Sequence, residues 1–376
     1  FCASAALAAG EARAEGDVGR RSAPIIGGYG SPEDPSVVQV TAPRHSAGDR
    51  GGCGGVLVAP NLVLTARHCT ADFENIVFEC DPTLPNGGGP DILAAAPAEE
   101  IRVYAGLAFV RDDGSDPNTP APVAFGKKLY ASPSTAICGN DVAALLLDRE
   151  VTTLPRAPVR LGPSRVGEEV YAVGWGQRST RLGPPGPLQR RDGLQVLALG
   201  PTRYERAPGF RPMPAIEGEL MVGQVGCNGD SGSPLRAQGT NAVVGVLSYI
   251  LNVDPEKNTA KDLFEAFPWC GDGATTYYHT IAGRDFVLQA FADSGHRPWL
   301  EGQPEPAPFG QPCATSDACD SGVCLAGSGE PYCSALCDAA GACPEGYACI
   351  SVEGRALCGR DGGGAADGGG ALDGGA

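Results

Sequence analysis

Short apolar runs punctuated by turn residues dominate the sequence from about residue 25 to residue 293. Runs such as Val142–Leu147, Val170–Val173 and Val243–Leu247 have the length of single strands, and Gly, Pro, Asn or Asp punctuate the sequence between them. A helical period of apolar residues occurs only near Asp285–Phe291. Many short strands separated by turn signals are typical of an all-β sandwich or barrel. The pattern therefore predicts an all-β domain over this region.

Three further zones follow this region. Residues 294–312 are rich in proline and are predicted to be a linker. Eight of the 15 cysteines lie in residues 313–358. So small a segment buries too little apolar surface to fold unaided, and we therefore expect crosslinks there. Residues 359–376 are half glycine, with Asp and Ala, and we expect a flexible tail.

The amino-terminal residues and the cysteine content both indicate export. Residues 1–14 are mostly small and apolar and end in Ala12-Arg13-Ala14, which fits an A-x-A cleavage site. We interpret them as the remnant of a signal peptide, with a disordered alanine-rich terminus as the alternative. On that interpretation Cys2 leaves with the leader, and an even number of cysteines remains to pair. Such cysteine usage favours an oxidising compartment and predicts a secreted or cell-surface protein.

The charge balance argues against one class of partner. The chain has 44 acidic and 28 basic residues and a formal net charge of −16. Nucleic-acid binding depends on cations that meet phosphates, so we expect no nucleic-acid partner. No apolar run reaches the roughly 18 residues typical of a membrane-spanning helix, so no such helix is predicted.

The strongest chemical signal is a serine, Ser231, in the glycine-rich loop Gly226-Cys227-Asn228-Gly229-Asp230-Ser231-Gly232-Ser233-Pro234. A serine exposed on a tight turn can act as a nucleophile when an adjacent base takes its proton. Among the four histidines, His68 follows an apolar strand and precedes Cys69. Asp141 opens another apolar strand and offers the acid that holds such an imidazole in place. Taken singly, each residue also has an ordinary structural explanation, as a turn, a strand cap or a structural histidine.

Several motifs occur together in one order along the chain. They are Ile25-Ile26-Gly27-Gly28, Thr65-Ala66-Arg67-His68-Cys69, Asp141-Val142-Ala143, Gly174-Trp175-Gly176, Gly229-Asp230-Ser231-Gly232 and Ser248-Tyr249. In this order they resemble the trypsin/chymotrypsin family of serine endopeptidases, over about residues 25–293. Any one motif is weak, but six in the same order outweigh the structural explanations of the single residues.

The resemblance implies a fold and a mechanism. The fold is two orthogonal antiparallel six-stranded β-barrels with a C-terminal helix near Asp285, and the active site lies between the barrels. Ser231 would be the nucleophile, His68 the general base and then acid, and Asp141 the residue that orients the imidazole. The N–H groups of Gly229 and Ser231 would form the oxyanion hole. The implied partners are protein or peptide substrates, and we expect neither a cofactor nor a metal.

The same resemblance implies disulfides. One would hold the histidine loop, a second would brace the wall of the specificity pocket, and a third, atypical of the family, would tether the long insertion between His68 and Asp141. In that order, the pairs are Cys53–Cys69, Cys227–Cys270 and Cys80–Cys138. The third pair is assigned because its two cysteines are left over in this domain, although spacing alone does not determine connectivity.

Activation in this family requires a cut before the first Ile, here Ile25, whose new ammonium then pairs with Asp230. Residues 15–24 would be a propeptide and the protein a zymogen, which implies an activating protease as a partner. A basic residue usually precedes the cut, but Ile25 follows Ser22-Ala23-Pro24, and Arg20-Arg21 lies three residues too early. Either the activating protease cuts directly before Ile25, or trimming follows a first cut at the arginines.

The specificity pocket implied by the resemblance is apolar. Val225 stands where trypsin-like members have an aspartate at the pocket floor, so a cationic P1 side chain would lose its charge partner. Ile250 stands on one wall, where deep-pocket members carry glycine, and Thr276 stands on the opposite wall. Ser248 would line the cleft. We therefore expect an elastase-like preference for small or medium aliphatic P1 residues.

The cysteine-rich segment, residues 313–358, resembles small modules appended to secreted proteins of myxobacteria and related Gram-negative bacteria. Cys319–Cys324, Tyr332-Cys333-Ser334 and Cys343–Cys349 carry this likeness. A zinc site is the competing interpretation, but the segment contains neither a CxxC pair nor a histidine. The Gly/Asp-rich tail looks like the spacer before a C-terminal surface-sorting signal, which predicts anchoring at the cell surface.

A second function stays open on the sequence alone. The chain would then be a catalytically silent, protease-like scaffold for binding or adhesion, with the cysteine-rich module as its working part. The intact triad and Gly229 favour the endopeptidase, whereas the unusual activation site favours the scaffold.

Overall fold

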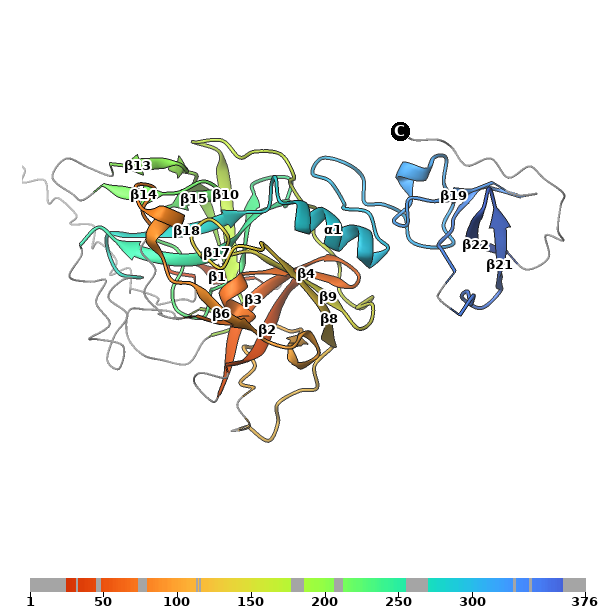
Figure 1. Ribbon diagram of the computed structural model, residues 1–376, viewed down its shortest axis with the longest axis horizontal. Coiled ribbons are helices and arrows are strands. Elements are labelled where there is room, and N and C mark those ends of the chain that lie inside the picture. The colour runs from red at the N-terminus through yellow and green to blue at the C-terminus, as the bar shows by residue number, and fades with distance from the viewer. Residues whose placement is uncertain are drawn as a thin grey trace, which may run out of the picture.

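The computed structural model describes residues 25–31, 33–44, 49–73, 80–112, 114, 116–176, 186–205, 212–254, 270–326, 329–337 and 340–360. The predicted signal remnant (1–14), the predicted propeptide (15–24) and residues 361–376 of the predicted tail lie outside this part of the chain. The described residues form a large β-rich body and a smaller C-terminal region beside it (Figure 1). Among them, no helix has the length and apolar character needed to cross a membrane.

The first half of the body is a closed antiparallel barrel with the strand order β2–β3–β4–β9–β8–β7. In that order, the strands span Val37–Arg44, Asp49–Ala59, Leu62–Thr65, Ala143–Leu147, Ala124–Ala131 and Arg102–Tyr104. The pairing of Gln39 in β2 with Tyr104 in β7 closes the barrel.

The apolar run after Asp141 becomes β9, and both faces of this strand are buried. Leu145 and Leu147 pack in the barrel core, whereas Ala144 and Leu146 pack in a second cluster that includes residues of the C-terminal helix. Alternate residues of a strand face opposite sides of the sheet, so this one run contributes to two cores. That double burial explains why the run carries no polar residue.

The second half of the body is an antiparallel sheet of eight strands, in the order β1–β11–β10–β16–β17–β18–β15–β12. In that order, the strands span Tyr29–Gly30, Gln189–Gln195, Glu169–Gly174, Pro234–Ala237, Val243–Asn252, Ala274–Thr280, Glu219–Val222 and Ala198–Leu199. Within the described residues, no ladder between β1 and β12 joins the ends of this sheet. The all-β class and one closed six-stranded barrel are thus confirmed, and the second closed barrel stays a prediction.

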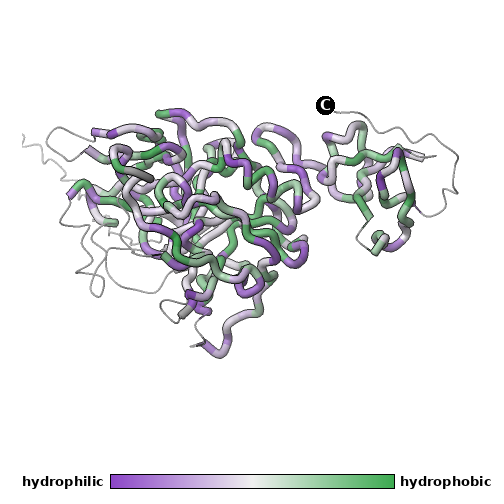
Figure 2. The backbone as a smooth tube through the Cα atoms, viewed as in Figure 1, coloured by the Kyte–Doolittle hydropathy of each residue, from purple (hydrophilic) through white to green (hydrophobic). Residues whose placement is uncertain are grey.

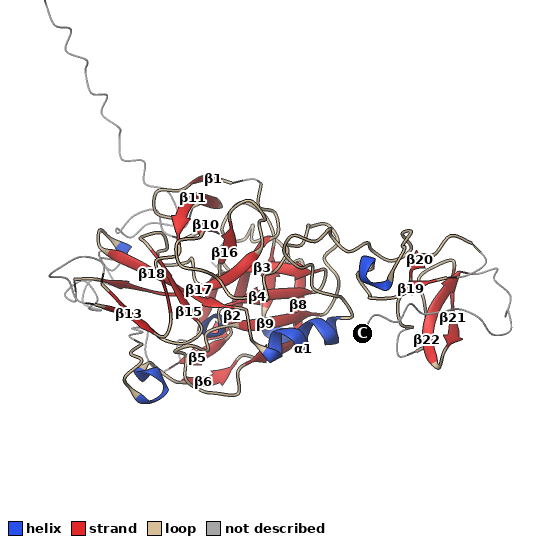
Figure 3. Cartoon of the chain, turned by 90° about the horizontal axis from the view of Figure 1, so that it is seen from above, coloured by secondary structure: helices blue, strands red, loops and turns tan. Residues whose placement is uncertain are grey.

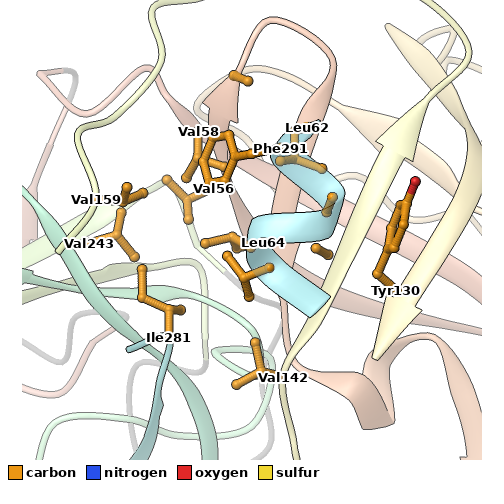
Figure 4. Close-up of a cluster of buried hydrophobic side chains, with 14 of the residues drawn as sticks. Val56, Val58, Leu62, Leu64, Tyr130, Val142, Val159, Val243, Ile281 and Phe291 are labelled. Atoms are coloured by element: carbon orange, nitrogen blue, oxygen red, sulfur yellow. The ribbon is translucent and has the colours of Figure 1, made fainter. Parts of the chain in front are cut away.

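The helical period near the end of the domain becomes helix α1 (Asp285–Ser294), as predicted. Val287 and Phe291 are buried on one face of α1, in the cluster that contains Leu62 and Leu64 of β4 (Figure 4). Gly295 ends the helix in the left-handed conformation, with φ of 77°, which glycine adopts without a steric cost. Figure 3 shows α1 beside the barrel, on the side of the body that faces the C-terminal region.

Among the described residues, the body also contains two short antiparallel pairs and several single 3₁₀ turns. The pairs are β5 (Ala71–Phe73) with β6 (Ile92–Ala95) and β13 (Thr202–Tyr204) with β14 (Met213–Ala215). The 3₁₀ turns span Arg67–Cys69, Pro85–Gly88 and Ala98–Glu100, and a further one, Ser316–Ala318, lies in the C-terminal region. The first of these turns carries His68.

The C-terminal region consists of two small hairpins held by disulfides. The hairpins are β19 (Cys324–Leu325) with β20 (Tyr332–Cys333) and β21 (Tyr347–Val352) with β22 (Arg355–Arg360). The disulfides are Cys313–Cys324, Cys319–Cys333, Cys337–Cys349 and Cys343–Cys358. The hydropathy colouring of Figure 2 shows hydrophobic segments in this region as well as in the body. Disulfides thus supplement a small apolar cluster, as expected for so short a segment.

Strand β22 extends two residues into the segment expected to be a tail. Gly359 and Arg360 belong to this strand, where they pair with Ala348 and Tyr347. The Arg360 guanidinium also lies over the ring of Tyr332, at 4.1 Å from its centroid. Gly359 begins the glycine-rich stretch, so composition alone assigns residues 359 and 360 to the tail. Only the cross-strand pairing shows that they belong to a strand.

The proline-rich segment 294–312 is docked on the body along part of its path. The Val159 N–H donates to the carbonyl of Trp299 (2.8 Å), and the Glu301 N–H donates to the carbonyl of Val159 (3.0 Å). The guanidinium of Arg160 holds the Glu301 carboxylate at 2.5 and 2.7 Å. The segment therefore connects the two regions while it contacts the first of them.

Candidate active site

The barrel register brings His68 and Asp141 to the same end of two neighbouring strands. Thr65, at the end of β4, pairs with Ala143, at the start of β9. His68 follows the first of these residues and Asp141 precedes the second, so an antiparallel pair places them together. The disulfide Cys53–Cys69 ties the turn that carries His68 to β3.

The imidazole of His68 is bound directly to the buried carboxylate of Asp141. His68 Nδ1 lies 2.7 Å from Asp141 Oδ2, and the His68 backbone N–H donates to Oδ1 at 2.8 Å. The Ser248 hydroxyl donates to Oδ2 as well. Asp141 has no exposed surface, whereas the His68 side chain is 10% exposed. The imidazole therefore keeps one edge toward solvent while the acid behind it is fully enclosed.

The partners of Asp141 decide its ionisation. Burial opposes the charged form, but the charge of His68 and the hydrogen bonds from His68 and Ser248 outweigh it. Together they hold the pKa of Asp141 well below its ordinary value, so the carboxylate is ionised at neutral pH. An ionised, immobile acid fixes the His68 tautomer with its proton on Nδ1, so that Nε2 carries the lone pair that can accept a proton.

The serine loop lies where the two halves of the body meet. The Gly54 N–H of β3, in the first half, donates to the Ser231 carbonyl at 2.7 Å. The Gly232 N–H donates to the Leu247 carbonyl of β17, in the second half, also at 2.7 Å. Ser231 itself is partly exposed. The loop is thus fixed to both halves next to the disulfide that holds the histidine turn.

Asp230 and Ile25 occupy the buried side of the same loop. Asp230 Oδ1 accepts the Gly176 N–H (2.7 Å) and Oδ2 accepts the Cys227 N–H (2.9 Å). Burial raises the pKa of Asp230 to about 7, because these two bonds do not compensate fully for the loss of water. Ile25 is fully buried in a cluster with Val225, and the Ile26 N–H donates to the Val225 carbonyl at 2.7 Å. The amino-terminal motif is therefore docked close to the floor of the predicted pocket.

The predicted pocket residues come together in part. Ile250 of β17 pairs with Thr276 of β18, and both side chains flank Gly226. Thr276 Oγ1 accepts the N–H groups of Val225 (3.3 Å) and Gly226 (3.1 Å). Val225 is fully buried. The Ser248 hydroxyl is bound to Asp141 and the residue is only 2% exposed, and its role in lining the cleft stays a prediction.

The structure also contains the three disulfides named for this domain, Cys53–Cys69, Cys227–Cys270 and Cys80–Cys138. The second of them packs against Ile250, beside the predicted pocket. Three groups of potential metal ligands occur among the described residues, and all of their cysteines are in disulfides. A disulfide sulfur is not the thiolate that zinc requires.

Two polar residues next to Asp141 were not expected at the site. The sequence gives His279 only an ordinary structural interpretation, and Glu219 shows no motif. In the structure the Asp141 N–H donates to His279 Nδ1 at 2.8 Å, and His279 Nε2 lies 3.1 Å from Glu219 Oε1. The one available signal is a histidine near the end of a run of β-branched and aromatic residues, Ala274–Thr280, in a chain with few histidines. A cavity of about 920 Å³ lies nearby, lined in part by Asn140, Glu219 and Arg284.

A closed β-barrel joined to a second antiparallel sheet, with a serine loop, a histidine and a buried aspartate at their junction, defines the chymotrypsin-like class of serine-protease domains. The Trypsin family model matches residues 25–267, well over half of the chain, and the chain therefore belongs to the trypsin family. The resemblance inferred from the six motifs is thereby confirmed.

Curated relatives agree with this assignment. Chymotrypsin-like elastase family member 3B of Homo sapiens is 30% identical over 217 residues, which cover 53% of this chain and 67% of that protein. Proproteinase E of Bos taurus is 30% identical over 217 residues, covering 53% of this chain and 72% of that protein. Granzyme M of Rattus norvegicus is 29% identical over 211 residues, covering 52% and 68%.

Proposed function

We propose that this protein is a secreted serine endopeptidase that hydrolyses peptide bonds through an acyl-enzyme. The observation that carries the proposal is the bond between His68 Nδ1 and the buried, ionised Asp141 (2.7 Å), at the junction that also holds the Ser231 loop. A solvated histidine without such a partner would not be held in one tautomer. The arrangement is the one that an alcohol nucleophile needs near neutral pH.

The proposed reaction has two stages. Ser231 Oγ attacks the scissile carbonyl while His68 Nε2 takes the hydroxyl proton, and the imidazolium is stabilised by Asp141. The N–H groups of Gly229 and Ser231 bind the oxyanion, and His68 then passes the proton to the leaving amine. Water hydrolyses the resulting ester by the same steps, which regenerates Ser231. The positive φ of Gly229 (95°) supports this role, because such a backbone turns the peptide in a way that other residues rarely adopt.

Activation by a cut before Ile25 is part of the proposal. The Asp230 carboxyl is buried and its pKa is raised to about 7, so its ionised form lacks sufficient stabilisation. An ammonium created at Ile25 would supply the missing charge and lower that pKa. The docked position of Ile25 and Ile26 supports this step, since the side chain is already enclosed.

The proposed substrates are proteins or peptides with a small or medium aliphatic P1 residue. Ile250 and Thr276 flank the position where a deep pocket would open, and the floor position, Val225, offers no carboxylate. Export is supported by seven disulfides among the described residues, because such bonds persist in oxidising compartments. We also propose that the second half of the body is a second closed barrel and that the C-terminal region anchors the protein at the cell surface.

Replacement of the nucleophile tests the function. We expect Ser231→Ala to lose peptidase activity, by at least about 1,000-fold, with no loss of folded protein, because the removed hydroxyl is not part of the core. A fluorophosphonate should label processed wild-type protein at Ser231, as identified by mass spectrometry, and should not label this variant.

The neighbouring serine of the loop provides a matched control. Ser233 is buried, and its hydroxyl has no hydrogen-bond partner among the described residues. We expect Ser233→Ala to keep both labelling and turnover. Correctly processed wild-type protein that is neither labelled nor active would contradict the proposal and favour the silent scaffold.

A further inference from the structure

A buried polar chain continues behind Asp141 into the second half of the body. The Asp141 N–H donates to His279 Nδ1 (2.8 Å), and His279 Nε2 faces Glu219 Oε1 at 3.1 Å. Asp141 and His279 have no exposed surface, and Glu219 is 1% exposed. Burial of a carboxylate and an imidazole is costly unless both are paired, so this arrangement needs an account.

The hydrogen-bond donors in this series of residues determine the tautomer of His279. A backbone N–H can only donate, so Nδ1 must carry a lone pair where it meets Asp141. The ring proton is then on Nε2, which donates to Glu219. A carboxylate that accepts from one ring nitrogen fixes the ring orientation and makes the other nitrogen a stronger acceptor. Glu219 therefore acts on His279 much as Asp141 acts on His68.

Glu219 is itself held in place from two further directions. Its Oε2 accepts the Ile216 N–H at 2.9 Å and the Tyr249 hydroxyl at 3.1 Å. Burial and the nearby charge of Glu219 raise the pKa of Tyr249 well above its ordinary value, so the phenol stays protonated and donates. Glu219 and His279 are also cross-strand partners in β15 and β18. The pair is therefore rigid and its hydrogen bonds are satisfied.

The hydrogen-bonded series Asp141–His279–Glu219 connects the two halves of the body at Asp141, the residue that orients the His68 imidazole. Asp141 lies two residues before β9 of the barrel, whereas β15 and β18 belong to the eight-stranded sheet. The direction of the Asp141 carboxylate depends on where its backbone lies, and this carboxylate must accept two bonds from His68 and one from Ser248. A displacement of about 1 Å in a catalytic arrangement can cost about 100-fold in rate.

We propose that His279, oriented by Glu219, is a positioning residue for peptide-bond hydrolysis, acting through the backbone N–H of Asp141. This inference rests on the proposed endopeptidase function. Neither residue touches the substrate, so they affect the chemical step and not substrate binding. Loss of the contact should therefore lower kcat and leave KM unchanged.

Two substitutions at His279 separate positioning from packing. His279→Leu fills similar space but leaves the Asp141 N–H without its acceptor, and we expect kcat to fall about 10- to 100-fold. His279→Asn places a side-chain oxygen where Nδ1 lies, and we expect it to recover most of kcat. In both variants KM for a peptide substrate should stay within about twofold of wild type and the order of P1 preference should be unchanged. Titration of active sites with a fluorophosphonate corrects each kcat for the amount of competent enzyme.

If His279→Leu does not fold, a variant of its partner Glu219 tests the same proposal. Glu219→Gln keeps the shape of the side chain and removes its charge, and we expect kcat to fall about tenfold with KM unchanged. His296→Leu is the matched control, because His296 is also paired with carboxylates, Asp320 and Glu150, but belongs to the docked linker, and it should keep kcat on a small peptide substrate.

The outcomes separate this inference from the function on which it rests. Full kcat in folded His279→Leu, equal losses in the Leu and Asn variants, or full kcat in Glu219→Gln would overturn the positioning role while the endopeptidase assignment stands. Wild-type protein that lacks both turnover and labelling at Ser231 overturns the function and the inference together.

Discussion

Three positions next to the serine loop must be glycine, because a side chain there would collide with Asp230 or Ser233. A Cβ atom at Gly174 or Gly176 would lie 2.2 or 2.0 Å from the Asp230 carboxylate. At Gly54, a Cβ would lie 2.1 Å from Ser233 Oγ. Real Cβ atoms do not approach other atoms so closely, so these residues let the loop that carries Ser231 pack against both halves of the body. The two glycines of the motif Gly174-Trp175-Gly176 are therefore needed because the Asp230 carboxylate occupies the space that a side chain would fill.

The residue-scale prediction concerns Ile250. Its side chain flanks Gly226 opposite Thr276, so removal of the branched side chain should open the pocket. We expect Ile250→Gly to raise kcat/KM for a Phe substrate relative to a Val substrate by about tenfold or more, because each methylene of fit is worth about 1–3 kcal/mol. A fluorogenic library that varies only P1 measures this ratio.

Ile250→Val is the control for that experiment, since it removes one methylene and should change the ratio little. For the wild-type protein we expect the highest kcat/KM with Ala, Val or Leu at P1 and the lowest with Lys or Arg. A wild-type preference for Arg would refute the pocket assignment.

At the scale of elements, one apolar run and one helix link the barrel to the rest of the body. β9 supplies Ala144 and Leu146 to the cluster in which α1 buries Phe291 (Figure 4). Because Asp141 lies two residues before β9, the packing of α1 behind this strand also stabilises the position of the proposed catalytic acid. Helix α1 is therefore a supporting element of the site, although none of its residues belongs to the triad.

The element-scale prediction compares two residues of α1. Phe291 is 2% exposed, whereas Leu288 is 50% exposed on the same helix. We expect Phe291→Ala to lower the free energy of unfolding by about 3–5 kcal/mol, since it removes a buried ring and leaves a cavity. Leu288→Ala should change it by no more than about 0.5 kcal/mol. Urea denaturation of both full-length variants with disulfides intact, followed by tryptophan fluorescence, tests this; equal losses would contradict the packing described.

At the scale of the whole molecule, a buried ionic cluster docks the C-terminal region on the body. The guanidinium of Arg156 binds Asp320 and Glu305 and donates to the Pro306 carbonyl. On the other side of Asp320, His296 Nδ1 lies 2.6 Å from its carboxylate, and His296 Nε2 lies 3.2 Å from Glu150. The cluster joins residues of the body, the proline-rich segment and the cysteine-rich region, so it determines how these parts are arranged.

The whole-molecule prediction is a pH-dependent loosening of this arrangement. Burial opposes protonation of His296, but the bonds and charges of Asp320 and Glu150 outweigh it and raise its pKa from 6.5 to about 9. A raised pKa means that protonation favours the docked state fully below about pH 6.5, and this contribution is lost as the pH rises through about 9. Small-angle scattering of the full chain should therefore show a larger maximum dimension at pH 9.5 than at pH 6.

Two substitutions complete this test. Asp320→Asn should give the larger dimension already at pH 6, because it removes the charge that both Arg156 and His296 bind. Asp317→Asn is the control, since Asp317 is 73% exposed in its pair with Arg297 and an exposed pair contributes little. A wild-type dimension that is independent of pH, together with a dimension of Asp320→Asn equal to that of wild type at pH 6, would rule out the docking role of this cluster.

Much of this protein could be predicted from the sequence where the signal is local. The triad motifs lie in short segments whose glycines and apolar neighbours identify them, and the period of three to four residues near Asp285 predicts α1 because a helix is built from local contacts. The long apolar run after Asp141 predicts a strand, and the structure adds that every residue of β9 is buried. Family likeness added the pairs Cys53–Cys69 and Cys227–Cys270, and Cys80–Cys138 followed because those two cysteines were left over in the domain.

Tertiary structure decided the contacts that depend on registers between distant strands. His279 has its proposed role because β18 pairs with β15 and approaches Asp141. Asp141 and His279 are 138 residues apart in the chain, so no local pattern connects them. The same holds for the bond between the Ser248 hydroxyl and the Asp141 carboxylate, which joins residues 107 positions apart in the chain. In the C-terminal region, composition predicted a linker and a tail, whereas docking and pairing placed Trp299 and Arg360 in ordered contacts. A hydrogen bond requires two atoms within about 3 Å, and for residues far apart in the chain only the packed fold determines which atoms meet.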